Sequence, residues 1–153
     1  MKTNSYFDIG ANLTHESFDK DLITVIEEAK QNNVKKICIT STSIEDTRVS
    51  LKLLENDQDF FITTCGIHPH YADTFEESNI REIKELSEHP SVKAIGETGL
   101  DFNRNYSKKD NQILCFKSQI EVAQDLNLPL FLHQRDAHKA VSYTHLPSPR
   151  DNR

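Results

Sequence analysis

Two carboxylates and a guanidinium follow a short apolar segment in the middle of the chain. Residues 92–95 have the character of a strand that breaks at Gly96, and a predicted loop then presents Glu97, Asp101 and Arg104. Enzymes built on parallel sheets keep reactive groups just past the strand ends, because the strand is rigid and the loop is open to a ligand. The sequence therefore predicts that this segment carries the chemistry of the protein.

Three other predicted strands end in residues of the same kind. The groups are Asp8 and Asn12 after the first strand, His68 and His70 after the third, and His133, Arg135 and Asp136 after the fifth. The carboxyl ends of parallel strands lie on one rim, so these side chains are expected to converge. Carboxylates and imidazoles together are ligands for Zn²⁺, Mn²⁺ or Mg²⁺ acting as a Lewis acid or generating hydroxide. The sequence thus predicts a metal site on this rim.

Several of these side chains also have a simpler interpretation. Asp8 is equally consistent with a hydrogen bond to a turn amide. His68 and His70 are equally consistent with solvent-facing loop histidines, although an extended segment around Pro69 places both imidazoles on one side. His133 fits the simpler interpretation less well, because an imidazole that closes an apolar strand needs a polar partner.

The charged residues of the central segment leave two interpretations open as well. Glu97 is consistent with a capping or ion-paired acid, but its position directly after a buried strand and a glycine favours a functional role. Arg104, Lys108 and Lys109 form either a solvated patch or, beside the carboxylates, a contact for a phosphate backbone.

The elements that must position these residues alternate between strand and helix. Strands are predicted at residues 6–10, 36–40, 60–65, 92–96 and 128–133, and helices at about 18–31, from the N-cap Ser43 to about 54, at 77–87 and at 109–126. Near-continuous apolar strands indicate a parallel sheet covered by helices. This α/β pattern fits an open doubly wound sheet or part of a (β/α)₈ barrel. No glycine-rich phosphate loop follows the first strand, which disfavours the nucleotide-binding version.

Composition sets the broad class of the protein. A chain of 153 residues with 36% hydrophobic and 27% charged residues suits one globular domain with a core. No apolar run approaches the ~20 residues of a membrane span, and we expect no signal peptide. Cys38, Cys65 and Cys115 lack metal-type spacing, so we expect them in the core of a protein in the reducing cytoplasm.

The charge of the chain is unevenly distributed. The formal net charge is −6, and residues 1–93 carry 10 Lys and Arg against 17 Asp and Glu, whereas residues 94–140 carry six of each. This balance argues against a surface that coats nucleic acid. A phosphate-bearing substrate would have to be held by local groups or by a metal.

The character of the sequence changes after Ala140. Residues 141–153 contain two prolines that a helix interior would not hold, where a fifth helix should continue. We interpret residues 141–153 as a non-native tail translated from sequencing-adapter read-through, and residues 1–140 as the native part. His145 is accordingly given no role.

Four motifs carry a family resemblance. They are Phe-Asp-Ile-Gly-Ala-Asn-Leu at 7–13, Gly-Ile-His-Pro-His at 66–70, Ala-Ile-Gly-Glu-Thr-Gly-Leu-Asp-Phe at 94–102 and Leu-Phe-Leu-His-Gln-Arg-Asp-Ala at 130–137. In this order and spacing they resemble the TatD family of metal-dependent deoxyribonucleases, from residue 6 to about residue 140. The resemblance implies a TIM barrel, (β/α)₈, of the metal-dependent hydrolase type, truncated here after about five βα units.

The resemblance also implies an activity. It implies a nuclease that hydrolyses phosphodiester bonds as a 3′→5′ exonuclease on single-stranded DNA or RNA, with a role in DNA repair. The implied cofactor is a divalent metal ion, Mg²⁺ first and Mn²⁺ or Zn²⁺ otherwise. We expect a cytoplasmic protein with no membrane partner that is a monomer when full length.

Site residues are carried over by position. The resemblance makes Glu97 and His133 metal ligands and places His68 near the metal and the scissile phosphate, so that His68 and Glu97 are the predicted catalytic residues. Asp8 and Asn12 are further candidates beside the metal. The predicted substrate-binding residues are His70, Asp101, Arg104 and Arg135.

Two departures from the family pattern stand out. Most of the family opens with Asp-x-His-x-His, which supplies two imidazoles to a second metal, whereas those positions here are Gly10 and Asn12. The family's remaining metal-binding His and its catalytic Asp come from the second half of the barrel. This chain has about five predicted strands, while a full barrel takes ~250 residues.

Three alternatives remain open. A related amidohydrolase would act on a small amide or ester instead of nucleic acid. The second alternative is that Glu97 and Asp101 are the acid pair of a glycosidase, an enzyme that needs no metal. The third alternative is that the chain is an inactive fragment. The open sheet edges and exposed apolar faces of a half barrel would then lead to marginal stability or aggregation.

Overall fold

The computed structural model describes residues 4–145, in which strands and helices alternate as predicted. The strands are β1 (Tyr6–Ala11), β2 (Val34–Ile39), β3 (Phe61–Cys65), β4 (Val92–Asp101) and β5 (Leu130–Arg135). The α-helices are α1 (Leu22–Gln31), α2 (Ile44–Leu54), α3 (Glu77–Ser87), α4 (Lys109–Leu126) and α5 (His138–His145). Two short 3₁₀ helices, η1 (Glu16–Phe18) and η2 (Pro69–Thr74), follow β1 and β3.

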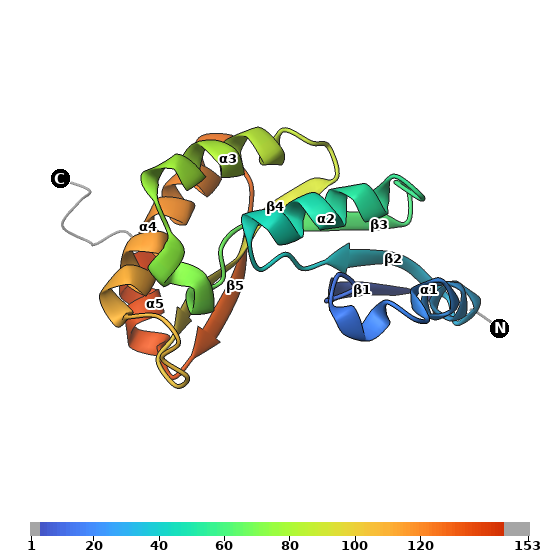
Figure 1. Ribbon diagram of the computed structural model, residues 1–153, viewed down its shortest axis with the longest axis horizontal. Helices are drawn as coiled ribbons and strands as arrows, with labels where there is room; N and C mark the ends of the chain where they lie inside the picture. The colour runs from blue at the N-terminus through green and yellow to red at the C-terminus, as the bar shows by residue number, and fades with distance from the viewer. Residues whose placement is uncertain (1–3, 146–153) are drawn as a thin grey trace.

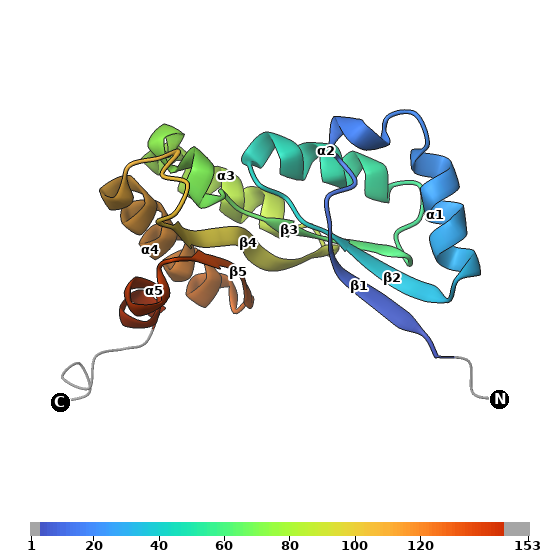
Figure 2. The ribbon, with the colours of Figure 1, turned by 90° about the horizontal axis from the view of Figure 1, so that it is seen from below.

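The five strands form one parallel sheet in the order β1-β2-β3-β4-β5. An open doubly wound sheet reverses its strand order at a switch point, whereas a barrel adds each strand beside the previous one. The sheet curls, and α1, α2 and α3 lie on the same side of it (Figures 1 and 2). The predicted fold, half of a (β/α)₈ barrel with five βα units, is therefore confirmed.

The core lies between the sheet and its helices. Ile39 of β2, Leu54 of α2 and Phe61 of β3 pack together near the start of the chain, while Ile95 of β4 packs with Ile83 of α3 farther along. The three cysteines are buried, as predicted: Cys38, Cys65 and Cys115. Burial raises the pKa of the Cys38 thiol to about 11 and that of the Cys115 thiol to about 12, so both are protonated at neutral pH.

Helix boundaries agree with the sequence pattern at α2, α3 and α4. Ser43 caps α2, since its Oγ accepts a hydrogen bond from the Asp46 N–H at 3.1 Å. The first predicted helix is wrong at its start, because Phe18 ends η1 and the α-helix begins only at Leu22. Phe18 and Leu22 nevertheless both pack against the apolar cluster that contains Ile39 and Phe61.

The predicted break at Gly96 is wrong, because β4 continues to Asp101 and carries both Glu97 and Asp101 within the strand. Gly96 and Gly99 have φ values of +144° and +139°, a region that residues with a Cβ rarely adopt. A Cβ on Gly96 would lie 2.3 Å from the Phe131 carbonyl oxygen, and one on Gly99 would lie 2.0 Å from the His133 carbonyl oxygen. The glycines therefore let β4 shift register and stay paired with β5 instead of ending it.

The two outer strands have open edges, as expected for half of a barrel. Within residues 4–145, β1 pairs only with β2 and β5 only with β4. Large apolar side chains of these strands are exposed, namely Tyr6, Phe7 and Ile9 on β1 and Leu132 on β5. Both edges and these side chains are available for contact with further polypeptide.

The last described helix extends into the predicted tail. Helix α5 runs to His145, five residues into the predicted tail, and Val141 is buried in the cluster around Leu100 and Phe116. Residues 146–153, including Pro147 and Pro149, lie outside the described residues. The division at residue 140 into a native part and a non-native tail stays a prediction.

A search for membrane-spanning helices within residues 4–145 finds none that has both the length and the apolar character required.

Candidate metal centre

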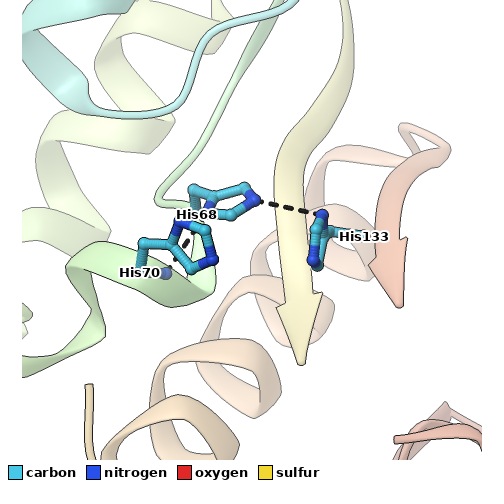
Figure 3. A group of neighbouring side chains, drawn as sticks. All are labelled: His68, His70 and His133. Carbon is cyan, nitrogen blue, oxygen red and sulfur yellow. Dashed lines mark hydrogen bonds between the residues drawn. The ribbon is translucent and has the colours of Figure 1, made fainter. Parts of the chain in front are cut away.

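Three histidines from separate parts of the chain meet at the rim formed by the carboxyl ends of the strands. His68 and His70 lie between β3 and the first turn of η2, and His133 lies on β5. Figure 3 shows their rings gathered around β4, with His68 directed at His133. One nitrogen of each ring lies within 4.8 Å of the others. The structure therefore brings together the predicted groups that follow the third and fifth strands.

His68 is fixed by its position at the start of η2. Its Nδ1 accepts a hydrogen bond from the His70 N–H at 3.2 Å, and its Nε2 lies 3.1 Å from His133 Nδ1. The predicted extended segment is present at His68 only, because the chain turns into η2 at Pro69. The His68 and His70 rings nevertheless lie on the same side, with centroids 4.3 Å apart.

The protonation of His68 follows from these contacts. Burial lowers the pKa of His68 to about 4, so the imidazole is neutral near pH 7. Because Nδ1 accepts a hydrogen bond, we assign the single proton to Nε2. His68 Nε2 lies 3.1 Å from His133 Nδ1 and 3.7 Å from Glu97 Oε1. His68 therefore presents a hydrogen-bond donor to the centre and lacks the free lone pair that a ligand needs.

Glu97 and His133 are in direct contact across β4 and β5. Glu97 Oε1 lies 3.1 Å from His133 Nδ1. Two ligands that each lie about 2.1 Å from one cation, at right or tetrahedral angles, are about 3.0–3.4 Å apart. The separation of these two atoms thus fits a shared divalent ion, and a carboxylate oxygen with an imidazole nitrogen is a suitable donor pair.

The contact between Glu97 and His133 also stabilises a proton on the imidazole. A hydrogen bond with His133 lowers the pKa of Glu97, and the same contact raises the pKa of His133. Such a proton competes with a cation for the lone pair on His133 Nδ1.

Asp101 orients the imidazoles of His70 and His133 through hydrogen bonds. Its side chain is fully buried, and Oδ2 accepts hydrogen bonds from His70 Nε2 at 2.8 Å and from His133 Nε2 at 3.3 Å. Oδ1 accepts hydrogen bonds from the backbone N–H groups of Asn103 and Arg104. Burial acts to raise the pKa of Asp101, but these hydrogen bonds outweigh it and the pKa is lowered. A carboxylate is therefore held against the nitrogen of His133 that faces away from Glu97, an arrangement common behind metal-binding histidines.

This placement bears on two expectations for Asp101. Its carboxylate is engaged in four hydrogen bonds and shielded from solvent, which favours an orienting role over the predicted contact with substrate. The glycosidase alternative needs a carboxyl group that can reach a sugar and exchange a proton with it. A buried, fully engaged Asp101 does not meet that requirement.

Helix α4 holds two of the strand ends with glutamine side chains. Gln119 accepts from the Ile67 N–H at 2.8 Å and donates to the Ile67 carbonyl at 3.0 Å, while Gln112 makes the same pair of contacts with the backbone of Asp101 at 2.9 and 3.1 Å. Each amide therefore acts in place of a neighbouring strand. Ile67 directly precedes His68, so these buried contacts position both sides of the centre.

Asp8 and Asn12, the further metal candidates, make local contacts. Asp8 Oδ1 accepts a hydrogen bond from the Gly10 N–H at 3.1 Å, and Asn12 Oδ1 accepts one from the Thr14 hydroxyl at 3.4 Å. Among the described His, Cys, Asp and Glu side chains, the group close enough together to hold a metal ion is His68, His70 and His133, and it does not include Asp8. The contact of Asp8 is the turn hydrogen bond of its simpler interpretation.

The two predicted arginines lie at the edge of the centre. Arg104 is exposed, and its Nη1 donates to the Tyr106 hydroxyl at 3.3 Å. Arg135 is exposed at the end of β5, where its backbone pairs with Asp101. Neither is among the side chains that contact Glu97 or His133 in the described part of the chain. A role in binding substrate stays a prediction for both.

Sequence reasoning missed the two glutamines of α4. Gln112 and Gln119 are seven residues apart and lie on the same helix face as the apolar residues Cys115 and Phe116, which are buried. Polar side chains at core positions require buried partners, and this spacing was the available signal.

The comparison with known proteins agrees with this geometry. The chain matches the family described as TatD related DNase over residues 7–145. It is 44% identical over 132 residues to the 3′-5′ ssDNA/RNA exonuclease TatD of Musicola paradisiaca, a match that covers 86% of this chain and 50% of that protein. The chain thus spans about half the length of this relative.

Two solved structures share the fold. A hydrolase TatD family protein from Entamoeba histolytica superposes with a TM-score of 0.84 at 28% identity, covering 92% of this chain and 53% of that one. An uncharacterized amidohydrolase from Saccharomyces cerevisiae superposes with a TM-score of 0.80 at 27% identity, covering 92% and 51%. Because the family match extends over most of the residues that build the sheet and its rim, this chain belongs to the TatD related DNase family.

Proposed function

We propose that this chain forms the N-terminal, metal-binding half of a nuclease that hydrolyses phosphodiester bonds in single-stranded DNA or RNA from the 3′ end. The observation that carries the proposal is the contact between Glu97 Oε1 and His133 Nδ1 at 3.1 Å, with buried Asp101 behind the imidazole. The name of the Musicola paradisiaca relative supports the substrate class. The remaining ligands would come from strands that follow β5 in the complete barrel.

A divalent ion held by Glu97 and His133 would supply Lewis-acid activation of a phosphoryl oxygen and a more acidic bound water. We propose Mg²⁺ as this ion, with Mn²⁺ and Zn²⁺ as the alternatives that an imidazole ligand suits.

The side chains around this pair have separate roles. His68 is neutral and buried, and its Nε2–H is directed at the centre, where it can donate to a phosphate oxygen as negative charge develops. Asp101 holds the His133 ring in the orientation that leaves Nδ1 facing Glu97. Arg104 and Arg135 supply positive charge at the open edge of the centre, where they would contact the substrate backbone.

The setting of the protein is part of the proposal. Three buried thiols support a reducing compartment, for which we propose the cytoplasm. We further propose that the full-length protein is a monomer and acts in DNA repair.

The test is a change of Glu97 to alanine in the full-length protein, with digestion of 3′- and 5′-labelled single-stranded DNA measured with and without Mg²⁺. We expect a loss of at least about 100-fold in metal-stimulated digestion, because the ion loses one ligand and the His133 proton loses its partner. Glu121→Ala is the matched control, since Glu121 is an exposed acid on α4. Near-normal digestion by Glu97→Ala would refute the assignment.

A second candidate function is hydrolysis of a small amide or ester at the same centre. The structural likeness to a protein described as an amidohydrolase favours it. Turnover of a panel of small amides and esters, with no digestion of oligonucleotides by the same preparation, would establish this function in place of the nuclease.

A further inference from the structure

An exposed tyrosine stands beside the metal centre on the loop between β4 and α4. Tyr106 exposes 62% of its surface, and its ring centroid lies 4.7 Å from that of His70, with the two rings nearly perpendicular at 75°. His70 in turn donates to Asp101, the residue that orients His133. A large apolar ring therefore stands in solvent, separated from the candidate metal ligand only by His70.

The loop that carries Tyr106 is fixed at its next residue. The Ser107 hydroxyl donates to the His70 carbonyl at 2.8 Å and accepts from the Asp73 N–H at 3.1 Å, and Gln112 donates to the Ser107 carbonyl at 2.9 Å. The ring thus occupies a set position before any ligand arrives. A pre-positioned aromatic side chain loses little conformational entropy when it binds.

The same loop concentrates positive charge in an acidic protein. Arg104, Lys108 and Lys109 are exposed within six residues, while the whole chain has a net charge of −6. The Arg104 guanidinium carbon lies 5.9 Å from the centroid of the Tyr106 ring, and its Nη1 donates to the Tyr106 hydroxyl. An aromatic ring with adjacent cations is the combination by which proteins hold single-stranded nucleic acid, since the ring stacks on a base and the cations contact phosphates.

We propose that Tyr106 is a stacking platform for a nucleobase of the single-stranded substrate, next to the metal centre, and that Arg104 contacts an adjoining phosphate. The inference rests on the proposed nuclease function and adds the contact that holds the strand. Every base has an aromatic face, so this contact tolerates any sequence. It gives Tyr106 a positioning role, because its ring holds the strand and does not touch the reacting phosphate.

Binding to two oligonucleotides tests the platform. The full-length protein with Mg²⁺ is titrated with fluorescent phosphorothioate strands of equal length, one with bases and one abasic throughout. Tyr106→Ala should weaken binding of the strand with bases by roughly 5- to 150-fold, the range for loss of one stacked base, and change binding of the abasic strand less than about twofold. Tyr106→Phe keeps the ring and should bind both strands within about threefold of the unsubstituted protein.

Two controls separate stacking from indirect effects. Leu114→Ala truncates an exposed apolar side chain on α4 and should leave both affinities unchanged. A Mn²⁺ titration of Tyr106→Ala should give the same affinity as the unsubstituted protein, because the metal ligands are not altered.

The outcomes distinguish the two proposals. Equal losses on both strands, or no loss on either, would overturn the stacking role while leaving the nuclease proposal intact. An unsubstituted protein that binds neither strand would overturn the nuclease proposal and the platform with it.

Discussion

Replacing Gln119 by methionine removes the amide that forms two hydrogen bonds with the backbone of Ile67, and it keeps a side chain of similar length in the core. Gln119 and Ile67 are both buried, so water cannot take over the two lost hydrogen bonds. Each of the two orphaned buried groups costs about 1–3 kcal/mol, so Gln119→Met should lower the free energy of unfolding by about 2–6 kcal/mol. The loss should also weaken Mn²⁺ binding, because Ile67 directly precedes His68, whose Nε2 lies 3.1 Å from the candidate ligand atom His133 Nδ1.

Urea unfolding followed by far-ultraviolet circular dichroism measures this loss, and the Mn²⁺ affinity of the folded variant measures its effect on the centre. Gln124→Met is the matched control, since Gln124 is exposed on the same helix and should change stability by less than about 0.5 kcal/mol. A Gln119→Met protein as stable as this control would show that the amide contacts contribute no net stability, and the account of how α4 holds the strand end would be wrong.

Two further substitutions test other features of the fold. Gly99→Ala should lower the free energy of unfolding by about 2–4 kcal/mol, because its φ is +139° and its Cβ would overlap the His133 carbonyl oxygen. Gly10→Ala is the control, since its Cβ would be in ordinary contact with Phe131, and an equal urea midpoint for both variants would contradict the argument. Asp57→Asn tests the pair that Asp57 forms with Lys30 at 2.6 Å, which lowers the pKa of Asp57. A carboxyl group whose pKa is lowered by folding stabilises the protein above its unfolded pKa of about 4, and this stabilisation is lost on acidification. Asp57→Asn should therefore be less stable than the unsubstituted protein at pH 7 but not at low pH. A stability difference that does not depend on pH would refute the pairing.

Much of the fold follows from local patterns in the chain. The bounds of β3, α3 and α4 were predicted closely, because the local pattern of apolar residues reports which face of an element is buried. The contact of Glu97 with His133 follows from the same reasoning, since parallel strands bring their carboxyl ends to one rim.

The features that could not be predicted depend on contacts between distant residues. Gly96 has the local signature of a strand end, and only the close approach of the Phe131 carbonyl shows that it permits the strand to continue. The burial of Asp101 and the placement of Tyr106 beside His70 likewise depend on hydrogen bonds from several segments. Asp8 suited a metal ligand by type and position, but its carboxylate accepts a local hydrogen bond from the Gly10 N–H, which residue type alone does not reveal.

Strand β5 carries His133 and also leaves one backbone edge without a partner in the described part of the chain. A strand that docks along this edge comes to lie directly beside the imidazole. Completing the coordination shell and closing the sheet would then be coupled events, in which the affinity for the ion adds to the free energy of assembly. The cation would link the two halves of the barrel, and a chelator would lower the stability of the protein as well as the activity proposed for it.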